Sequence, residues 1–280
     1  MKMQRMFALL TVAVFPDGPA DAEELSVAND DLKQDRSFQS EEDIDKAIAD
    51  HSQAIRVKPD DASAYNKRGI AYANKGNYDK AIADFSQAIR LSPNYAVAYN
   101  NRGVVYNERW DYDLAIADHS QAIRLKPENA AAYYNRGNAY IDKGDPDRAI
   151  ADYDQAIRLN PNDAASYYNR GNAYAHKWDY DRAIADYDQV IRLSPDYPVA
   201  YNNRGNAYDE KGDHDRAIAD YDQAIRLNPD YDDAYFNRGL AYDRKGDYRR
   251  ARADYEKAVQ IDPNNACALQ SLEALRKEGH

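Results

Sequence analysis

The stretch AAAYYNRGNAYIDKGDPDRAIADYDQAIRLNPND, residues 130–163, decides the fold because the chain repeats it. Near-copies of these 34 residues follow one another without a gap. They begin at Ala62, Ala96, Ala130, Ala164, Pro198 and Asp232, and together they fill residues 62–265. A fixed period of this length is typical of stacked structural units that bury their apolar faces against one another.

The middle of the unit predicts a tight turn between two antiparallel helices. Gly144 can adopt the left-handed conformation that closes a helix, and Asp145 is a good N-cap for the next one. Pro146 suits the first position of a helix, and Pro161 stops the second helix. Each unit is therefore expected to be one helix pair.

The spacing of small and aromatic residues in the unit resembles the tetratricopeptide repeat. Its first helix carries an aromatic residue, then Gly, then Tyr, and its second carries Ala, an aromatic residue, Ala and a final Pro. In the third copy these are Tyr133, Gly137, Tyr140, Ala149, Tyr153, Ala156 and Pro161. The resemblance implies an all-α, right-handed superhelical solenoid of antiparallel helix pairs. It also implies a concave groove, lined by the first helices, that binds proteins or peptides.

Charged residues recur with the same period. Where the family usually has Leu before the Gly, this chain has Arg68, Arg102, Arg136, Arg170, Arg204 and Arg238. We interpret this Arg as structural, with its methylene stem on apolar surface and its head in water. Along the second helix we expect local ion pairs four residues apart, Arg148 with Asp152 and Asp154 with Arg158.

The two ends differ from the array. Residues 1–22 carry Lys2 and Arg5, a short apolar run and an A-x-A pattern, and they predict a signal peptide and export to a periplasm or outside the cell. The alternative is a cytoplasmic chain with a disordered N-terminus. Residues 23–61 predict a degenerate repeat with a good helix from about 42 to 57. Residues 266–280 predict a C-terminal capping helix.

Composition narrows the classes of function. A formal net charge of −11 argues against binding to nucleic acid. Cys267 is the single cysteine, and no apolar run reaches the roughly 20 residues that span a membrane. No catalytic motif, metal-ligand spacing or cofactor-binding loop is present, so we expect no enzyme activity, no metal and no cofactor.

Asparagine recurs on the predicted groove wall. The position two before the Gly holds Asn101, Asn135, Asn169, Asn203 and Asn237, and the position after the Gly holds Asn138, Asn172 and Asn206. An amide offers one donor and one acceptor, as a peptide unit does, so a row of amides can hold an extended chain. The row is similar to the asparagine ladder in the repeat domain of O-GlcNAc transferases. The alternative is that these residues came with duplication of the unit.

Other groove positions predict side-chain preferences in a ligand. Tyr134 and Tyr168 are expected to form an aromatic patch for an apolar side chain. Asp209, Glu210 and Asp243 are expected to make the C-terminal end of the wall acidic, which favours a basic ligand.

Two tryptophans occupy the turn. Trp110 and Trp178 replace the inter-helix glycine, two repeats apart, and so are expected on the same edge. Exposed Trp is a typical interface anchor, so both are candidate edge contacts. The alternative is that each ring lies over its own helix pair.

The leading hypothesis is a non-enzymatic scaffold or adaptor that holds an extended peptide or a partner protein in the concave groove. Among known proteins it resembles exported bacterial tetratricopeptide scaffolds. A structural or self-assembling protein that uses its edge is the second hypothesis. A regulatory subunit of an enzyme encoded elsewhere is the third. The sequence does not fix the oligomeric state.

Overall fold

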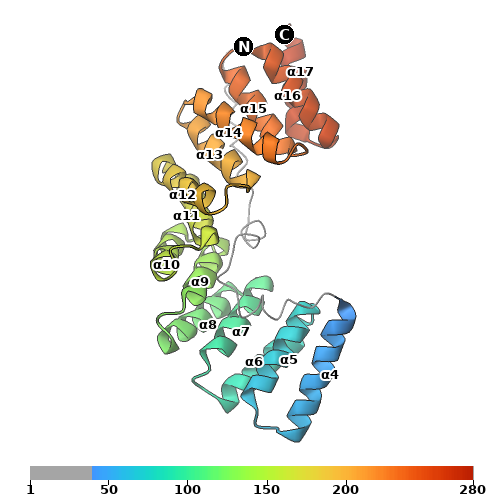
Figure 1. Ribbon diagram of the computed structural model, residues 1–280, viewed down its shortest axis with the longest axis vertical. Coiled ribbons are helices and arrows are strands. Elements are labelled where there is room, and N and C mark those ends of the chain that lie inside the picture. The colour runs from blue at the N-terminus through green and yellow to red at the C-terminus, as the bar shows by residue number, and fades with distance from the viewer. Residues whose placement is uncertain (1–39, 280) are drawn as a thin grey trace. The chain divides into compact units, whose positions relative to one another are not determined.

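The structure, a computed structural model, describes residues 40–279, and all regular structure there is helical. The helices are α4 (Glu41–Val57), α5 (Ala62–Asn74), α6 (Tyr78–Leu91), α7 (Ala96–Glu108), α8 (Tyr112–Leu125), α9 (Ala130–Asp142), α10 (Pro146–Leu159), α11 (Ala164–His176), α12 (Tyr180–Leu193), α13 (Pro198–Glu210), α14 (His214–Leu227), α15 (Asp232–Arg244), α16 (Tyr248–Ile261) and α17 (Ala266–Lys277) (Figure 1). The predicted all-α array of helix pairs is confirmed.

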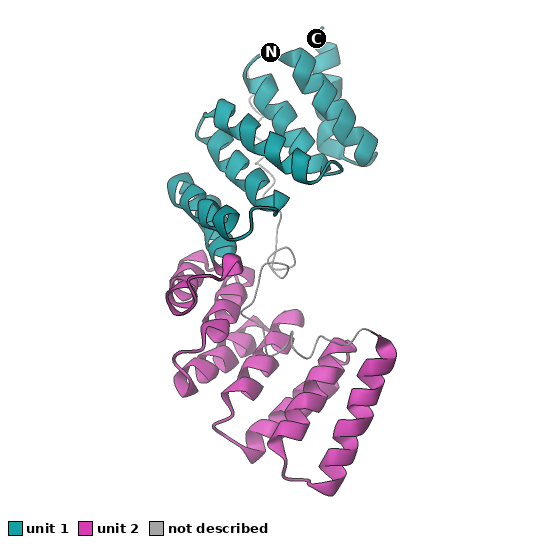
Figure 2. Ribbon diagram, viewed as in Figure 1, with its two compact units in different colours: residues 1–25, 167–280 teal, residues 26–166 magenta. Residues whose placement is uncertain are grey.

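The described chain forms two compact units, coloured separately in Figure 2. In chain order, the first unit runs from residue 40 to Ser166 and is magenta in Figure 2, and the second runs from Tyr167 to residue 279 and is teal, so the boundary falls inside α11. Each unit is described by itself below. The predicted signal peptide, residues 1–22, and the start of the degenerate repeat lie outside the described residues.

The turn between the two helices of a repeat follows the predicted chemistry. Gly144 has φ of +82°, and its N–H donates to the carbonyl of Ile141 while that of Asp145 donates to Tyr140. The Asp145 side chain then caps α10 by accepting from the backbone N–H of Arg148 at 3.2 Å. This pairing satisfies groups that both helix ends would otherwise leave exposed.

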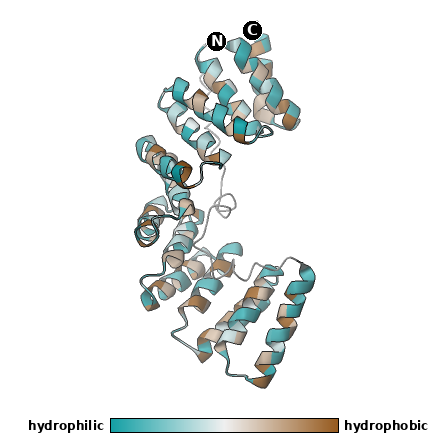
Figure 3. Ribbon diagram, viewed as in Figure 1, coloured by the Kyte–Doolittle hydropathy of each residue, from teal (hydrophilic) through white to brown (hydrophobic). Residues whose placement is uncertain are grey.

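A glycine lets the two helices of each repeat approach closely. A Cβ built on Gly137 would lie 2.7 Å from Cε1 of the buried Tyr153 ring. The same contact occurs between Gly69 and Phe85, and between Gly103 and His119, at 2.7 Å. Because the ring fills the space that a side chain would need, each repeat core is built around this pair. Most helix surface between such apolar positions is hydrophilic (Figure 3).

The first helices form the inner layer of each unit. In the first unit α5 contacts α7 and α7 contacts α9, and in the second α13 contacts α15. Second helices such as α6, α8 and α14 pack between two first helices, their own and the next. Because the first helices come closer together, each unit curves toward them, and they form its concave wall.

The Arg of the first helix is half-buried, and its head is held by the second helix of the same repeat. Arg136 Nε and Nη2 donate to the two carboxylate oxygens of Asp152, each at 2.7 Å, and this Asp side chain is 7% exposed. The guanidinium also stacks near the Tyr133 and Tyr140 rings. The structural role is as expected, but the expected wet head is wrong, because the guanidinium is held in a two-pronged ion pair.

The same fork recurs in every full repeat, always between residues 16 apart. The pairs are Arg68–Asp84, Arg102–Asp118, Arg136–Asp152, Arg170–Asp186, Arg204–Asp220 and Arg238–Asp254. The expected local pair of Arg148 with Asp152 is therefore wrong, and Arg148 instead pairs with its helix cap Asp145 at 2.5 Å. Arg158 donates to Oε1 of Gln155.

In the described part of the chain, the first and last helices, α4 and α17, lie outside the six helix pairs. α4 matches the predicted 42–57 helix and packs on α5, while α17 packs on α16 through Leu272 and Leu275. Within residues 40–279, no helix has the length and apolarity that crossing a membrane requires.

Candidate functional site: the first-helix wall

Three asparagines of the predicted ladder form hydrogen bonds that join one repeat to the next. The Nδ2 of Asn101 on α7 donates to Oδ1 of Asn66 on α5 at 3.2 Å. Asn135 on α9 donates likewise to Oδ1 of Asn100 at 3.2 Å. In the second unit Asn237 on α15 donates to Oδ1 of Asn202 on α13 at 3.1 Å. Each bond links residues 35 apart, so the amides connect neighbouring first helices.

These internal bonds change the hypothesis for the ladder. The hypothesis needs amides that offer a donor and an acceptor to a ligand, but in these three rungs one of the two N–H donors is already used within the protein. The ladder side chains are also buried: Asn101, Asn135, Asn169, Asn203 and Asn237 are between 0 and 8% exposed. The Oδ1 of Asn101 has no hydrogen-bond partner in the described part of the chain. Because this oxygen is buried too, the ladder in this structure is a link between repeats.

The second asparagine series serves the repeat cores. The buried Tyr153 donates its hydroxyl to Oδ1 of Asn138 at 2.7 Å. Tyr187 with Asn172 and Tyr221 with Asn206 repeat this bond at 2.8 Å. Where the core ring lacks a hydroxyl, as in Phe85 and His119, the matching position holds Ile70 or Val104 instead of Asn. These Asn residues therefore satisfy a buried hydroxyl.

The expected aromatic patch is not open to a ligand. Tyr134 and Tyr168 are 1% and 0% exposed, so the prediction of a surface pocket at these rings is wrong. The Tyr134 ring packs against Tyr153 with centroids 6.0 Å apart, and the Tyr168 ring packs against Tyr187 and Tyr197. The Tyr168 hydroxyl also accepts from Asn203 Nδ2 at 3.3 Å, in the place that Asn has in other rungs.

A second row of polar contacts runs along the same wall, seven residues further on. Asn107 on α7 donates to the Asp142 carboxylate on α9 at 2.7 Å. Burial raises the pKa of Asp142, and the bond from Asn107 opposes that effect. Because seven residues are two helical turns, both rows lie on the same face of the first helices.

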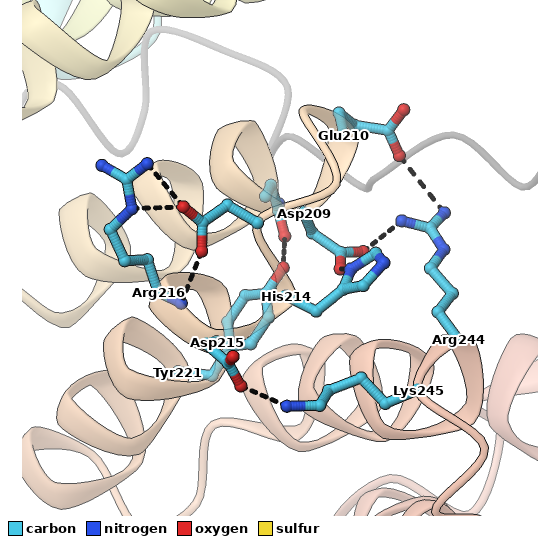
Figure 4. A network of polar contacts seen from close by, with 10 residues as sticks. Asp209, Glu210, His214, Asp215, Arg216, Tyr221, Arg244 and Lys245 are labelled. Carbon is cyan, nitrogen blue, oxygen red and sulfur yellow. Dashed lines mark hydrogen bonds and ion pairs between the residues drawn. The ribbon is translucent and has the colours of Figure 1, made fainter.

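At the C-terminal end this row becomes a charged network. Asp209 on α13 is 6% exposed and accepts from both His214 Nδ1 and the guanidinium of Arg244 on α15 (Figure 4). Glu210 also accepts from Arg244, at 3.3 Å. The expected acidic wall is wrong for these two residues, because Arg244 points at both carboxylates and neutralises part of their charge. Sequence reasoning overlooked Arg244. The available signal was its position 35 residues after Asp209, the same separation that the Asn rungs have.

His119 is a buried neutral core residue. Its side chain is 0% exposed, and its Nδ1 lies 3.0 Å from Oδ1 of Asn100, which also receives the Asn135 rung. Burial, and to a lesser extent the charge of Arg136, lowers the pKa of His119 to about 3. The imidazole therefore stays uncharged near neutral pH and belongs to the packing of the wall.

Both tryptophans keep the left-handed backbone of the glycine they replace. Trp110 has φ of 65° and Trp178 has φ of 62°. Their side chains are 79% and 69% exposed, so neither is covered by its own helix pair. Trp178 makes one edge contact with Tyr180, and Leu114 lies exposed four residues after Trp110. Sequence reasoning missed Leu114, which stands where other repeats have Lys or Arg.

The turn edge carries a further series of ion pairs between repeats. Lys143 pairs with Asp113, and Arg109, Lys211 and Lys245 pair with Asp79, Asp181 and Asp215 in the same way. All join residues 30 apart and are largely exposed, so each is worth at most about 1 kcal/mol. Across residues 40–279 no cluster of potential metal ligands is found.

Family models identify the repeats directly. Models described as tetratricopeptide or TPR repeats match residues 134–198, then 37–76, 106–144 and 205–246, then 62–95 and 232–265, and also 186–219. The chain belongs to the tetratricopeptide repeat family. Among curated proteins, none matches it.

Several solved structures share the fold. The chain is 30% identical to MamA, with a TM-score of 0.56, and the match covers 59% of this chain and 96% of MamA. It is 26% identical to YrrB, described as a TPR protein with an unusual peptide-binding site, with a TM-score of 0.58 and coverage of 70% and 97%. A TPR repeat-containing protein from Cytophaga hutchinsonii is 21% identical, with a TM-score of 0.69, and the match covers 88% of this chain and 98% of that protein. This likeness shows the fold alone.

Proposed function

We propose that this tetratricopeptide protein is a scaffold that holds an extended peptide or a partner protein against the concave wall of first helices. The fold is one that binds proteins and peptides, and a similar structure, YrrB, is described by its peptide-binding site. The observation that carries the proposal is the direct contact between neighbouring first helices, α5 with α7, α7 with α9 and α13 with α15, which places them side by side in one layer of each unit. The rungs fix the spacing of that wall.

The structure changes what the wall would offer to a ligand. Since the ladder amides are buried and bonded between repeats, they support the wall, and a ligand would contact the exposed side chains beside them. At the first repeat the ladder position holds Lys67, which is exposed. A ligand with an acidic group near this end complements Lys67.

A capture experiment with matched baits tests this function. Ala131 lies near the start of α9 on the wall and is half-buried, while Ala151 lies exposed on the second helix α10. We expect wild type and Ala151→Arg to capture the same partner from an extract of the source cell's envelope. Ala131→Arg should lose it with unchanged helicity, because the new side chain occupies the wall. Capture by all three baits would contradict the proposal.

The edge supports a second candidate, a structural or self-assembling role. A left-handed backbone at Trp costs about 1–2 kcal/mol, yet both Trp residues keep it with exposed rings. Light scattering over a range of concentrations tests this role. Mass that rises with concentration in wild type but stays constant in the Trp110→Gly, Trp178→Gly double variant would support self-assembly.

We also propose export, on the pattern of residues 1–22. The mass of the chain purified from its source tests this point. Loss of residues 1–22 supports export, and a mass that includes them contradicts it.

A further inference from the structure

Helix α4 occupies the place of a second helix in an incomplete repeat. It docks on α5 as the other second helices dock on the first helix that follows them. Arg68 donates to Ser52 Oγ on α4 at 3.1 Å, just as Arg102 donates to Ser86 Oγ on α6 at 2.9 Å. The exposed ion pair of Lys75 with Asp45 also matches the edge series.

No helix within residues 40–279 covers the opposite face of α4. In all six full repeats this face of the second helix is covered by the first helix of the same repeat, and its two small residues are fully buried. They are Ala81 and Ala88, Ala115 and Ala122, Ala149 and Ala156, Ala183 and Val190, Ala217 and Ala224, and Ala251 and Ala258, all 0% exposed. The corresponding residues of α4 are Ala47, which is half-buried, and Ala54, which is exposed.

The same face carries a carboxylate that lacks its usual Arg. In the full repeats the Asp at this position is 6–9% exposed along its side chain and is held in the Arg fork. On α4 the equivalent residue is Asp50, which is exposed and pairs with no cation within residues 40–279. An Arg on an incoming helix would complement this charge.

The six full repeats show what a helix needs to cover this face. It needs an Arg to reach the Asp and a Gly directly after it, because a Cβ there would lie 2.6–2.9 Å from the ring of the second helix. His51 holds the ring position on α4, as His119 does in the second repeat. Aromatic residues three before and four after the Arg complete the pattern.

Neither end of this chain encodes such a helix. In the 34-residue register the segment before α4 has Asp31, Gln34 and Asp35 where the pattern needs an aromatic residue, Arg and Gly. α17 is a lone first helix, but it has Glu273 in the place of the Gly. A second copy therefore cannot complete the repeat with its own α17.

We propose that the open face of α4 binds an amphipathic helix of a partner protein that carries an Arg-Gly step between two aromatic residues. The Arg of the partner donates two hydrogen bonds to the Asp50 carboxylate, and the Gly leaves room for the side chain of His51. This is recognition of a helix by a complementary helical face, and it is separate from the concave wall.

Peptide binding tests the proposal. The probe is a fluorescein-labelled, capped peptide with the sequence of residues 130–143, AAAYYNRGNAYIDK, titrated with the full-length chain and followed by anisotropy. We expect saturable binding. Asp50→Asn should weaken it at least about fivefold, and Ala54→Trp should abolish it by filling the face. Glu42→Gln, an exposed carboxylate on α4 that the register places off this face, should leave it unchanged.

Each other outcome overturns the proposal. Failure of the probe to bind wild type would mean that the face is already covered or has no affinity for such a helix. Binding that persists in both Asp50→Asn and Ala54→Trp would place the peptide elsewhere, including the wall. Because Asp50 is exposed, Asp50→Asn should fold normally, so the result does not depend on the bulkier variant.

Discussion

The second and third repeats, residues 96–129 and 130–163, have the same backbone but fill it with different partners. Both have the Arg–Asp fork and an Asn rung to the preceding first helix. In the third repeat Tyr153 donates a hydrogen bond to Asn138, whereas the equivalent positions of the second repeat hold His119 and Val104. The third repeat has Gly144 in its turn, whereas the second has Trp110.

The comparison separates residues that build the array from residues that distinguish one repeat from another. The polar contacts that both repeats share lie inside the protein: the Arg–Asp fork within a repeat and the Asn rung between repeats. The difference in the core is a matched set, because the Tyr153 hydroxyl has an acceptor in Asn138, whereas the His119 ring carries no hydroxyl and Val104 stands at the equivalent position. The exposed difference is Trp110 with Leu114, which has no packing role in this structure.

Breaking the shared Arg–Asp fork should change the free energy of unfolding most. Arg136→Leu restores the family's usual residue but leaves the Asp152 carboxylate buried without its partner. We expect a loss of about 3 kcal/mol or more in the free energy of unfolding, measured by urea denaturation at pH 7. Arg102→Leu in the second repeat should cost a similar amount. A loss below about 1 kcal/mol in both would contradict a structural fork.

The pH dependence of the second repeat should come next. The pKa of His119 is about 3 in the folded chain against about 6.5 when unfolded, so the unfolded state binds more protons between these values. The His119 contribution is therefore complete above pH 6.5 and is lost as the pH falls toward 3. Between pH 7 and 4.5 wild type should lose about 2 kcal/mol more than His119→Phe, which copies Phe85. Equal losses would contradict a buried neutral imidazole.

Exchanging the core pairs should give a smaller effect. His119→Tyr alone places a buried hydroxyl opposite Val104, which cannot accept its hydrogen bond. Adding Val104→Asn recreates the pair of the third repeat and should recover about 1 kcal/mol. Urea denaturation of both single variants and the double variant gives the coupling. Additive effects would show that the Tyr–Asn bond contributes nothing to the cores.

Replacing the Trp of the inter-helix turn should change the free energy of unfolding least, and it should stabilise the chain. Trp110→Gly relieves the left-handed conformation and should stabilise the chain by about 1 kcal/mol. Gly144→Ala in the third repeat, at φ of +82°, should destabilise it by a similar amount. If Trp110→Gly destabilises the chain instead, the indole has a packing role that its 79% exposure does not suggest.

The sequence predicted the parts of the fold that depend on neighbours within one unit. Gly144 and Asp145 closed and opened their helices as expected, because turn and cap chemistry act over a few residues. The partner of Asp152 was predicted wrongly, because Arg148 is near in sequence while Arg136 is near in space. A local rule about helices does not compare the two, and the buried fork is the stronger bond.

The candidate site was harder to predict, because its bonds cross repeats. Asn101 and Asn135 were placed on the correct helices, but their donors meet Asn66 and Asn100, each 35 residues earlier. That spacing is one repeat plus one residue, and a search within single repeats does not find it. The burial of Tyr134 likewise depends on a ring from the second helix of its repeat.

Hydrogen exchange of the chain, alone and bound to the partner captured by wild type, tests the central claim most directly. The account predicts new protection in the first helices α5, α7 and α9, with the second helices α6, α8 and α10 unchanged. Protection confined to second helices or to the turns at Trp110 and Trp178 would contradict it and place the binding surface on the edge.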